Sequence, residues 1–361
     1  MTAPAAPALQ LGPQTFYDDF ASLAFDTPKD MSHVWSPELG GFGSLGAHYL
    51  ASNHEGEVYV DPSFAGVFMG DNAGNVLGAA IDTNGMPVTL PYGRPGSASN
   101  PPAWIQQGKT PLGLNPFSRS PTGGLRITSS LTPLNLLALL WGRTRISGEL
   151  VTKPGAGNVG FVQQFGFFEC QWRCDGGQGV WPAFWLLPAS GAWPPEIDVF
   201  EGLGVDPTAL YGTGHSNKYG QPNYRQIASR GQSWALSSRR SGVLWTPTDL
   251  VFFTDGIETG RIPAPADMAQ PMYMLLDLAM GGKDPGGGQS WGGPIDATTP
   301  PVVNFDVDWV RVYALDPTFV LKPGPLNIGS APPPQPPPAK RSMDVVGKMG
   351  SAVFAGTITE Q

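Results

Sequence analysis

Three acidic residues, Glu196, Asp198 and Glu201, stand at positions i, i+2 and i+5 of the stretch EIDVFE. In a β-strand, side chains two residues apart point to the same face, so Glu201 would point away from the other two. One extra residue inserted as a β-bulge between Asp198 and Glu201 would bring all three to one face. The spacing therefore predicts a bulge at this point of the chain.

Two carboxyl groups about 5 to 5.5 Å apart suit retaining glycoside hydrolysis, with one as nucleophile and the other as acid and then base. Asp198, between them, would hold a proton or hydrogen bond and separate their pKa values. The alternative is an exposed strand edge with scattered acids. Clustered charged carboxyl groups in an apolar stretch with few basic neighbours cost folding free energy. Such a cluster is expected where the acids have a function, which favours a functional site.

The elements expected to position these acids are short strands separated by turns. The chain of 361 residues has 48 Gly and 39 Pro, and it contains no long stretch of helical periodicity. Strand-like segments occupy residues 15–20, 57–60, 125–129, 145–152, 166–174, 183–187, 196–200, 242–245, 250–254, 272–279 and 307–313. This pattern predicts an all-β sandwich or barrel.

The domain organisation follows from composition. Residues 1–14 are expected to be an N-terminal extension and residues 15–320 a catalytic domain, with long Gly- and Pro-rich loops at residues 61–124. Residues 321–361 are expected to form a Pro-rich linker and a tail without a core of its own.

Five motifs in the same order resemble glycoside hydrolase family 16, over about residues 16–313. They are GFFECQWRCDGGQGVWPAFWLLP (166–188), WPPEIDVFEG (193–202), LWTPTDLVFFTDG (244–256), PMYMLLDLAMGG (271–282) and FDVDWVRVY (305–313). The resemblance implies a β-jelly-roll of two curved antiparallel sheets with a concave substrate cleft. It also implies Glu196 as nucleophile, Asp198 as assisting acid and Glu201 as general acid/base, in a bulged form similar to that of laminarinases.

The same resemblance suggests residues that bind the substrate. Trp193, Trp181 and Trp185 match tryptophans that line the sugar cleft in the family, although Trp181 and Trp185 would also suit a core. His215 resembles a histidine that hydrogen-bonds near the acid/base; the alternative is a surface residue.

Two positions depart from the family pattern, since Asp277 stands where Asn is usual and Glu149 where many members carry Arg. Both change the polar contacts expected in the cleft and put a standard laminarin specificity in doubt.

Three further expectations concern ions and thiols. Asp308 matches a position that joins a structural Ca²⁺ site in many family members, so we expect a possible structural Ca²⁺ there and no cofactor required for catalysis. Cys170 and Cys174 are too far apart along a strand for a disulfide and are expected to be buried free thiols. A group of basic residues either faces an anionic polysaccharide or forms a solvated loop: Lys218, Arg225, Arg230, Arg239 and Arg240.

Charge and hydropathy exclude other classes. The net charge of −8 argues against nucleic acid as a partner. The longest apolar run, residues 134–141, is too short to span a bilayer. The N-terminal residues MTAPAAPALQLGPQ show no conventional export signal, which leaves a cytoplasmic protein, an exported one or part of a longer chain.

We therefore expect a monomeric, retaining endo-β-glycanase with a polysaccharide substrate. The substrate would be a β-1,3- or β-1,3/1,4-glucan or a related bacterial exopolysaccharide, and such a substrate favours an extracellular or cell-surface location. The alternatives are a transglycosylase or a non-catalytic carbohydrate-binding protein on the same fold.

Overall fold

A computed structural model describes most of the chain. The described residues are 11–39, 48, 53–70, 76–79, 105–107, 110–140, 142–155, 159–235, 237–283, 288–321, 324–328, 342–349 and 352–359. Much of the predicted N-terminal extension, the loop residues 80–104 and the Pro-rich residues 329–341 lie outside these ranges.

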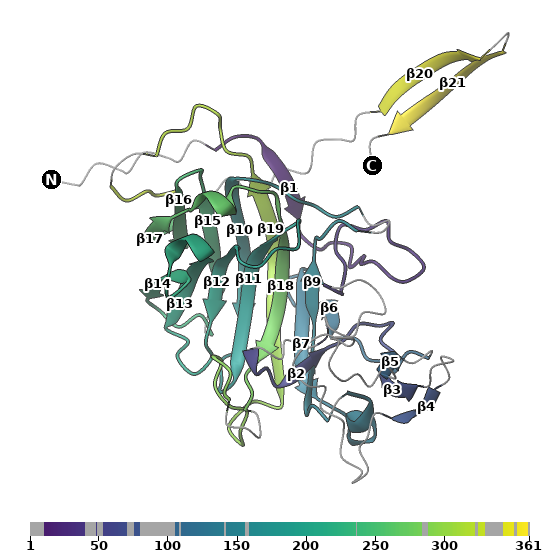
Figure 1. Cartoon of the computed structure of the whole chain (residues 1–361), viewed down its shortest axis with the longest axis vertical. Helices are drawn as coiled ribbons and strands as arrows, with labels where there is room; N and C mark the ends of the chain where they lie inside the picture. The colour runs from purple at the N-terminus through teal and green to yellow at the C-terminus, as the bar shows by residue number, and fades with distance from the viewer. Residues whose placement is uncertain are drawn as a thin grey trace.

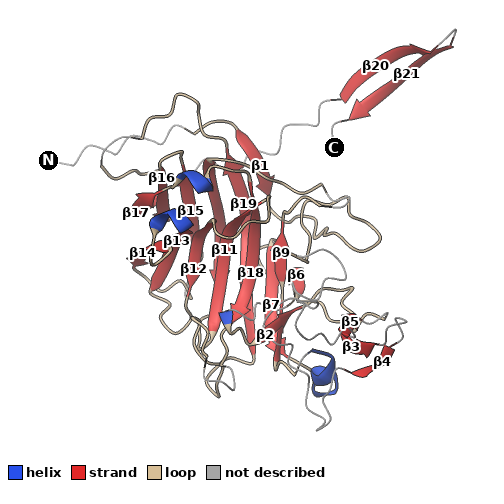
Figure 2. Ribbon diagram, in the orientation of Figure 1, coloured by secondary structure: helices blue, strands red, loops and turns tan. Residues whose placement is uncertain are grey.

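Two large sheets pack face to face (Figures 1 and 2). The ten-stranded sheet runs β17 (Ile257–Pro263), β16 (Asp249–Thr254), β15 (Arg239–Trp245), β10 (Gly166–Cys174), β19 (Val302–Tyr313), β7 (Leu125–Leu131), β8 (Arg145–Ser147) and β2 (Glu57–Tyr59), with β1 (Gln14–Asp18) beside β19 and β6 (Phe117–Arg119) beside β7. The six-stranded sheet runs β14 (Tyr224–Arg230), β13 (Ala209–His215), β12 (Glu196–Gly202), β11 (Val180–Pro188), β18 (Met272–Met280) and β9 (Glu149–Val151). The predicted all-β jelly-roll sandwich is confirmed.

Smaller elements lie outside this sandwich. β3 (Val67–Gly70), β4 (Val76–Ala79) and β5 (Ile105–Gln107) form a three-stranded sheet within the predicted long loops. β20 (Ser342–Met349) and β21 (Ala352–Thr359) pair with each other. The short 3₁₀ helices are η3 (Leu134–Leu140), η4 (Asn217–Tyr219) and η5 (Ala266–Met268). Within the described ranges, no helix has the length and apolar character needed to cross a bilayer.

The core between the two sheets fixes β12 in place. Ile197 and Phe200 point into it, and the Phe200 ring stacks on Trp172 of β10 with 4.1 Å between ring centroids. Burying a large apolar side chain contributes about 1.5 to 3 kcal/mol, so these contacts hold the inner face of β12 firmly. Cys170 and Cys174 belong to the same core as buried free thiols, as predicted.

Two departures from the predicted strands have local causes. Residues 145–152 form two strands, one in each sheet, divided at Gly148. A Cβ atom at Gly148 would lie 2.8 Å from Phe117 and Pro116 side-chain atoms, so this close passage requires glycine. β13 was not predicted because glycines weaken its strand propensity, yet Gly212 is needed where a Cβ would lie 2.4 Å from Phe252.

The predicted domain boundary at residue 320 falls inside a packed segment. Leu326 is buried against Phe167 and Leu244, and the Ile328 N–H donates to the Gly256 carbonyl. Apolar side chains beyond residue 320 therefore cover one end of the sandwich, and the packed body continues at least to Ile328.

Candidate active site

β12 carries the three acids and is bulged where their spacing requires it. Asp198 pairs with Thr213 of β13, and Glu201 pairs with Tyr211, so three steps on β12 oppose two steps on β13. β11 shows a matching shift of register against β12. Since Phe200 points into the core, the extra residue turns Glu201 to the face of Glu196 and Asp198. The predicted bulge is present.

Glu196 lies between an indole and an imidazole. The Trp193 Nε1–H donates to Glu196 Oε2 at 2.7 Å. His215 pairs with Glu196 across the strands, and its Nε2 lies 3.6 Å from Glu196 Oε1 and 3.2 Å from Asp198 Oδ2. Both groups favour the ionised carboxylate of Glu196.

Glu201 has aromatic neighbours. The Trp181 Nε1–H donates to Glu201 Oε1 at 3.1 Å, and Tyr211 is the cross-strand partner of Glu201. Trp181 is 9% exposed and packs in a small apolar cluster, so it is both a partner of Glu201 and part of a local core.

The protonation of the two glutamates follows from these surroundings. Burial raises the pKa of Glu196 to about 8, and Asp198 adds to the rise, while His215 and Trp193 oppose it. Burial and then the charges of Asp198 and Glu196 raise the pKa of Glu201 well above its usual range, against a hydrogen bond from Trp181. Because Glu196 has the imidazole beside it, the first proton lost from the pair leaves Glu196.

His215 gains basicity from the acids. Burial lowers its pKa, but the hydrogen bond to Asp198 and the charges of Asp198 and Glu196 outweigh burial, and the pKa is raised. Among the described residues, Glu196, Asp198 and His215 are the group whose ligand atoms lie within 4.8 Å of one another and could hold a metal ion.

Asp277 lies on the same face of the sheet, on β18. The Trp185 Nε1–H donates to Asp277 Oδ1 at 2.5 Å, and the Tyr59 hydroxyl donates to Oδ2 at 3.2 Å. Burial raises the pKa of Asp277 to about 7. Trp185 itself is half-buried beside Tyr273 and other apolar side chains, so it supports Asp277 and packs locally at the same time.

Glu149 pairs with Asp277 on the far side from β11 and is 1% exposed. Its Oε1 accepts a hydrogen bond from the Leu39 N–H at 3.3 Å. Burial and then Asp277 raise the pKa of Glu149 well above its usual range. The two departures from the family pattern therefore lie side by side in the sheet.

Sequence reasoning missed two further acids and a tyrosine near this pair. Glu55 and Glu57 are buried, and burial raises the pKa of Glu57 to about 8. Tyr59 donates to Asp277. Their spacing at i, i+2 and i+4 in HEGEVYV, one face of a strand, is the signal that could have identified them.

Trp291 was also missed. It is 41% exposed and stands edge-on to Trp181, with 5.6 Å between ring centroids, and to Tyr211, with 4.9 Å. Trp193, near Glu196, is 62% exposed. One exposed indole, Trp193, thus donates to Glu196, and the other, Trp291, contacts Trp181 and Tyr211, the two neighbours of Glu201. The Gly-rich surroundings of Trp291 in the sequence gave no signal of this contact.

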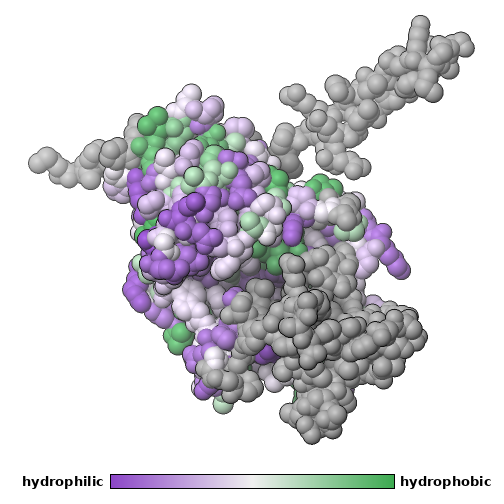
Figure 3. All heavy atoms as spheres, in the orientation of Figure 1, coloured by the Kyte–Doolittle hydropathy of each residue, from purple (hydrophilic) through white to green (hydrophobic). Residues whose placement is uncertain are grey.

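Most of the basic residues form ion pairs or hydrogen bonds away from Glu196, Asp198 and Glu201. Arg230 pairs with Asp206 at 2.7 Å, Arg239 with Asp255 at 3.0 Å and Arg240 with Glu169 at 2.8 Å. Arg225 donates to backbone carbonyls. On the face seen in Figure 3, hydrophilic residues dominate around β13 and β14. These pairings favour a solvated surface over a site for an anionic polysaccharide.

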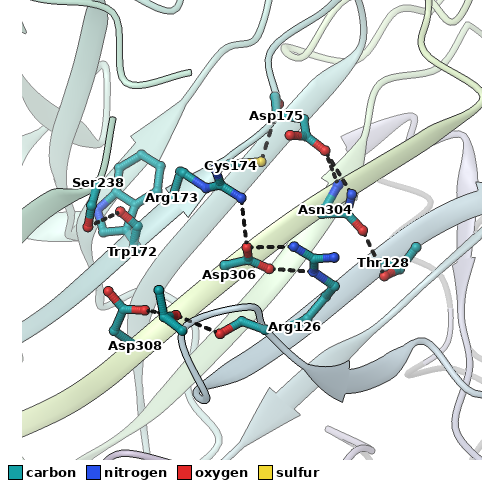
Figure 4. Close-up of polar contacts among 12 residues, drawn as sticks. Arg126, Thr128, Trp172, Arg173, Cys174, Asp175, Ser238, Asn304, Asp306 and Asp308 are labelled. Carbon is teal, nitrogen blue, oxygen red and sulfur yellow. Dashed lines mark hydrogen bonds and ion pairs between the residues drawn. The ribbon is translucent and has the colours of Figure 1, made fainter. Parts of the chain in front are cut away.

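Asp308 lies on the outer face of the ten-stranded sheet, near the Arg126–Asp306–Arg173 ion pairs (Figure 4). One of its oxygens accepts a hydrogen bond from the Thr122 hydroxyl, and the other accepts one from Gln171 Nε2 at 2.9 Å. Both oxygens of Asp308 are thus hydrogen-bonded to neighbouring side chains. The structural Ca²⁺ expected at Asp308 stays a prediction.

Comparisons with known proteins bear on this arrangement. Residues 147–311 match the model of the glycosyl hydrolases family 16. Endo-1,3-1,4-beta-glycanase EglC of Rhizobium meliloti (strain 1021) is 32% identical over 304 residues, which cover 84% of this chain and 52% of that protein. Endo-1,3-1,4-beta-glycanase ExsH of the same organism is 31% identical over 311 residues, with the same coverage. The chain spans about half the length of these two relatives.

The fold has solved counterparts. The laminarinase from Rhodothermus marinus superposes with a TM-score of 0.52 at 21% identity, covering 84% of this chain and 98% of that one. This likeness concerns the fold. The family match covers the bulged strand with all three acids, and residues 147–311 belong to glycosyl hydrolases family 16.

Proposed function

We propose that this chain is a retaining endo-β-glycanase in which Glu196 is the nucleophile and Glu201 the general acid/base. The observation that carries the proposal is the β12 bulge, which brings both glutamates and Asp198 to one face. Their unequal surroundings support the division of roles. Glu196 has two groups that favour its ionised form, whereas burial and neighbouring charge keep the proton on Glu201.

In the first step, the Glu196 carboxylate attacks the anomeric carbon of the bound sugar while Glu201 gives its proton to the glycosidic oxygen. The bond between anomeric carbon and glycosidic oxygen breaks, and the leaving sugar departs as an alcohol. A glycosyl ester on Glu196 remains, and Glu201 is left ionised.

In the second step, Glu201 takes a proton from a water molecule, whose oxygen attacks the anomeric carbon and releases Glu196. Two inversions give net retention. Asp198 and His215 lie against Glu196 and can compensate its loss of charge as the ester forms, because His215 Nε2 lies within 3.6 Å of both carboxylates.

The proposed substrate is a β-1,3- or mixed β-1,3/1,4-glucan, or a related bacterial exopolysaccharide. The names of the Rhizobium meliloti relatives support the linkage class. Trp193 and Trp291 are proposed platforms for sugar rings. Trp193 exposes its indole beside Glu196, and Trp291 exposes its indole against Trp181, which donates to Glu201. The ion pairing of Arg230, Arg239 and Arg240 supports an uncharged glycan backbone.

Three further properties are proposed with this function. The protein acts as a monomer. It works outside the cytoplasm or at the cell surface, where a polymeric glycan is found. Its reaction needs no cofactor, since the two carboxyl groups supply the nucleophile and both proton transfers.

The test compares wild type with Glu196→Gln on laminarin, lichenan, carrageenan, agarose and bacterial exopolysaccharides, by release of reducing ends. We expect wild type to cut laminarin or lichenan, and the variant to lose at least about 1,000-fold in rate. Equal rates for the two proteins on the best substrate would overturn the nucleophile assignment. A wild type that cuts nothing but is retarded in a polysaccharide affinity gel would favour the non-catalytic alternative.

A further inference from the structure

We propose that Asp277 is a positioning residue for Glu201, whose negative charge holds the proton on that carboxyl group. The inference rests on the proposed role of Glu201 as general acid. Asp277 is not one of the two reacting residues, Glu196 and Glu201, and it lies on another strand, β18.

The sheet register places Asp277 and Glu201 in one row. Asp277 of β18 pairs with Ala183 of β11, and Ala183 pairs with Glu201 of β12. Directly paired residues share a face of the sheet, and neighbouring strands are about 4.8 Å apart, so the two Cα atoms lie roughly 10 Å apart. The side chain between them is only the methyl group of Ala183. No bulky group therefore separates the two carboxyl groups along this row.

Asp277 is also better able to carry a negative charge than its buried acidic neighbours, Glu55, Glu57 and Glu149. It accepts hydrogen bonds from Trp185 Nε1 and from the Tyr59 hydroxyl, and both donors favour the ionised form. Glu149, one strand further from Glu201, has one hydrogen bond from the Leu39 N–H at 3.3 Å. Burial raises the pKa of Asp277 to about 7, so Asp277 becomes ionised while Glu201 still holds its proton.

The other titratable groups around the pair do not cancel this charge. Glu201 faces Asp198 and Glu196 on its own strand, and Tyr211 and His215 come from β13. The imidazole of His215 contacts Glu196 and Asp198. The groups that face Asp277 are four acids and a phenol: Glu55, Glu57, Glu149, Asp198 and Tyr59.

The expected size follows from the separation. A negative charge raises the pKa of a neighbouring acid, so removing it lowers the pKa of Glu201. At about 10 Å and an effective dielectric constant of about 20, the shift is about one pH unit at most. The alkaline limb of activity, where Glu201 loses its proton, should therefore move to lower pH in Asp277→Asn.

The experiment measures kcat/KM against pH for wild type and Asp277→Asn on the glucan that wild type cuts best. We expect the alkaline limb of the variant to lie about 0.5 to 1 pH unit lower. On an activated aryl glycoside, whose leaving group needs no proton, the alkaline limbs of the two proteins should coincide. The matched control Glu149→Gln should shift the limb on glucan by less, because Glu149 is one strand further away and burial raises its pKa well above its usual range, so that it carries less charge.

A second variant covers the case in which Asp277→Asn is inactive or unfolded. Trp185→Phe removes one of the two donors that favour ionised Asp277, so the alkaline limb on glucan should move down by less than the full loss of the charge would move it. Limbs that stay within about 0.2 pH unit of wild type, or that move equally on both substrates, would overturn the proposal. A wild type without activity on any glucan would instead overturn the proposed function, which keeps the two failures apart.

Discussion

His215 gives the sharpest test of how the site keeps its nucleophile ionised. The perturbation is His215→Gln, which removes the imidazole but keeps a side chain able to donate a hydrogen bond to a carboxylate. In the wild type, His215 Nε2 lies 3.6 Å from Glu196 Oε1 and 3.2 Å from Asp198 Oδ2. Removing a positive charge at this place raises the pKa of Glu196.

The magnitude follows from distance and exposure. Two unit charges 3.6 Å apart interact by about 5 kcal/mol at an effective dielectric constant of 20 and about 1 kcal/mol in bulk water. The His215 side chain is 24% exposed and shares its charge with Asp198, so the lower value is closer. The expected shift in the pKa of Glu196 is about one pH unit.

The assay is the pH dependence of kcat/KM on glucan. Activity on the acid side requires ionised Glu196, so the acid limb of His215→Gln should move about one unit toward higher pH. Trp193→Phe removes a hydrogen bond from Glu196 without removing a charge, and should move the limb in the same direction by less. An acid limb that stays in place or moves to lower pH in an active, folded variant would refute the reasoning.

Two other perturbations test separate parts of the account. Trp291→Ala should lower kcat/KM on polymeric glucan by about tenfold, because one sugar platform is lost. The melting temperature of the variant should change little. An unchanged kcat/KM would contradict the role of Trp291 as a platform. Glu57→Gln should be more stable than wild type by up to about 4 kcal/mol at pH 8 and equal to it near pH 4.5, as measured by urea denaturation. The sign follows because the pKa of Glu57 is raised from 4.5 to about 8 by burial, so the folded protein binds more protons and loses stability as pH rises through this range. A variant as stable as wild type at both pH values would be evidence against a protonated, buried Glu57.

The catalytic strand could be predicted from sequence because its signal is local. Side chains alternate between the two faces of a regular strand, so Glu201 at i+5 could not share a face with Glu196 and Asp198. A bulge is the simple solution. The same local reasoning identified the core strands around Phe168 and Trp172, where apolar residues alternate or run continuously.

Residues brought in by the fold could not be predicted in this way. Trp291 reaches Trp181 and Tyr211 from a Gly-rich loop, and no pattern in that loop encodes the contact. Glu57 is distant from Asp277 in sequence, and only the meeting of β2 with the second sheet makes the two acids neighbours. The hydrogen bonds that Asp308 accepts likewise come from residues distant in the sequence, Thr122 and Gln171.

Glycines and apolar residues near the chain ends caused the remaining differences. Gly148 permits one run of strand residues to pass from one sheet to the other, so residues 145–152 became two strands. Leu326 looked like part of a Pro-rich linker by composition, but its side chain is buried on the sandwich. Composition averages over a segment and cannot show where one apolar side chain finds a partner.

The most direct test of the central claim is the stereochemistry of cleavage. Proton NMR recorded in the first minutes of glucan hydrolysis, before mutarotation, identifies the anomer that is released. Attack by Glu196 followed by attack of water predicts the β-anomer as the first new reducing end. Release of the α-anomer would mean a single displacement and would contradict the assignment of Glu196 as nucleophile.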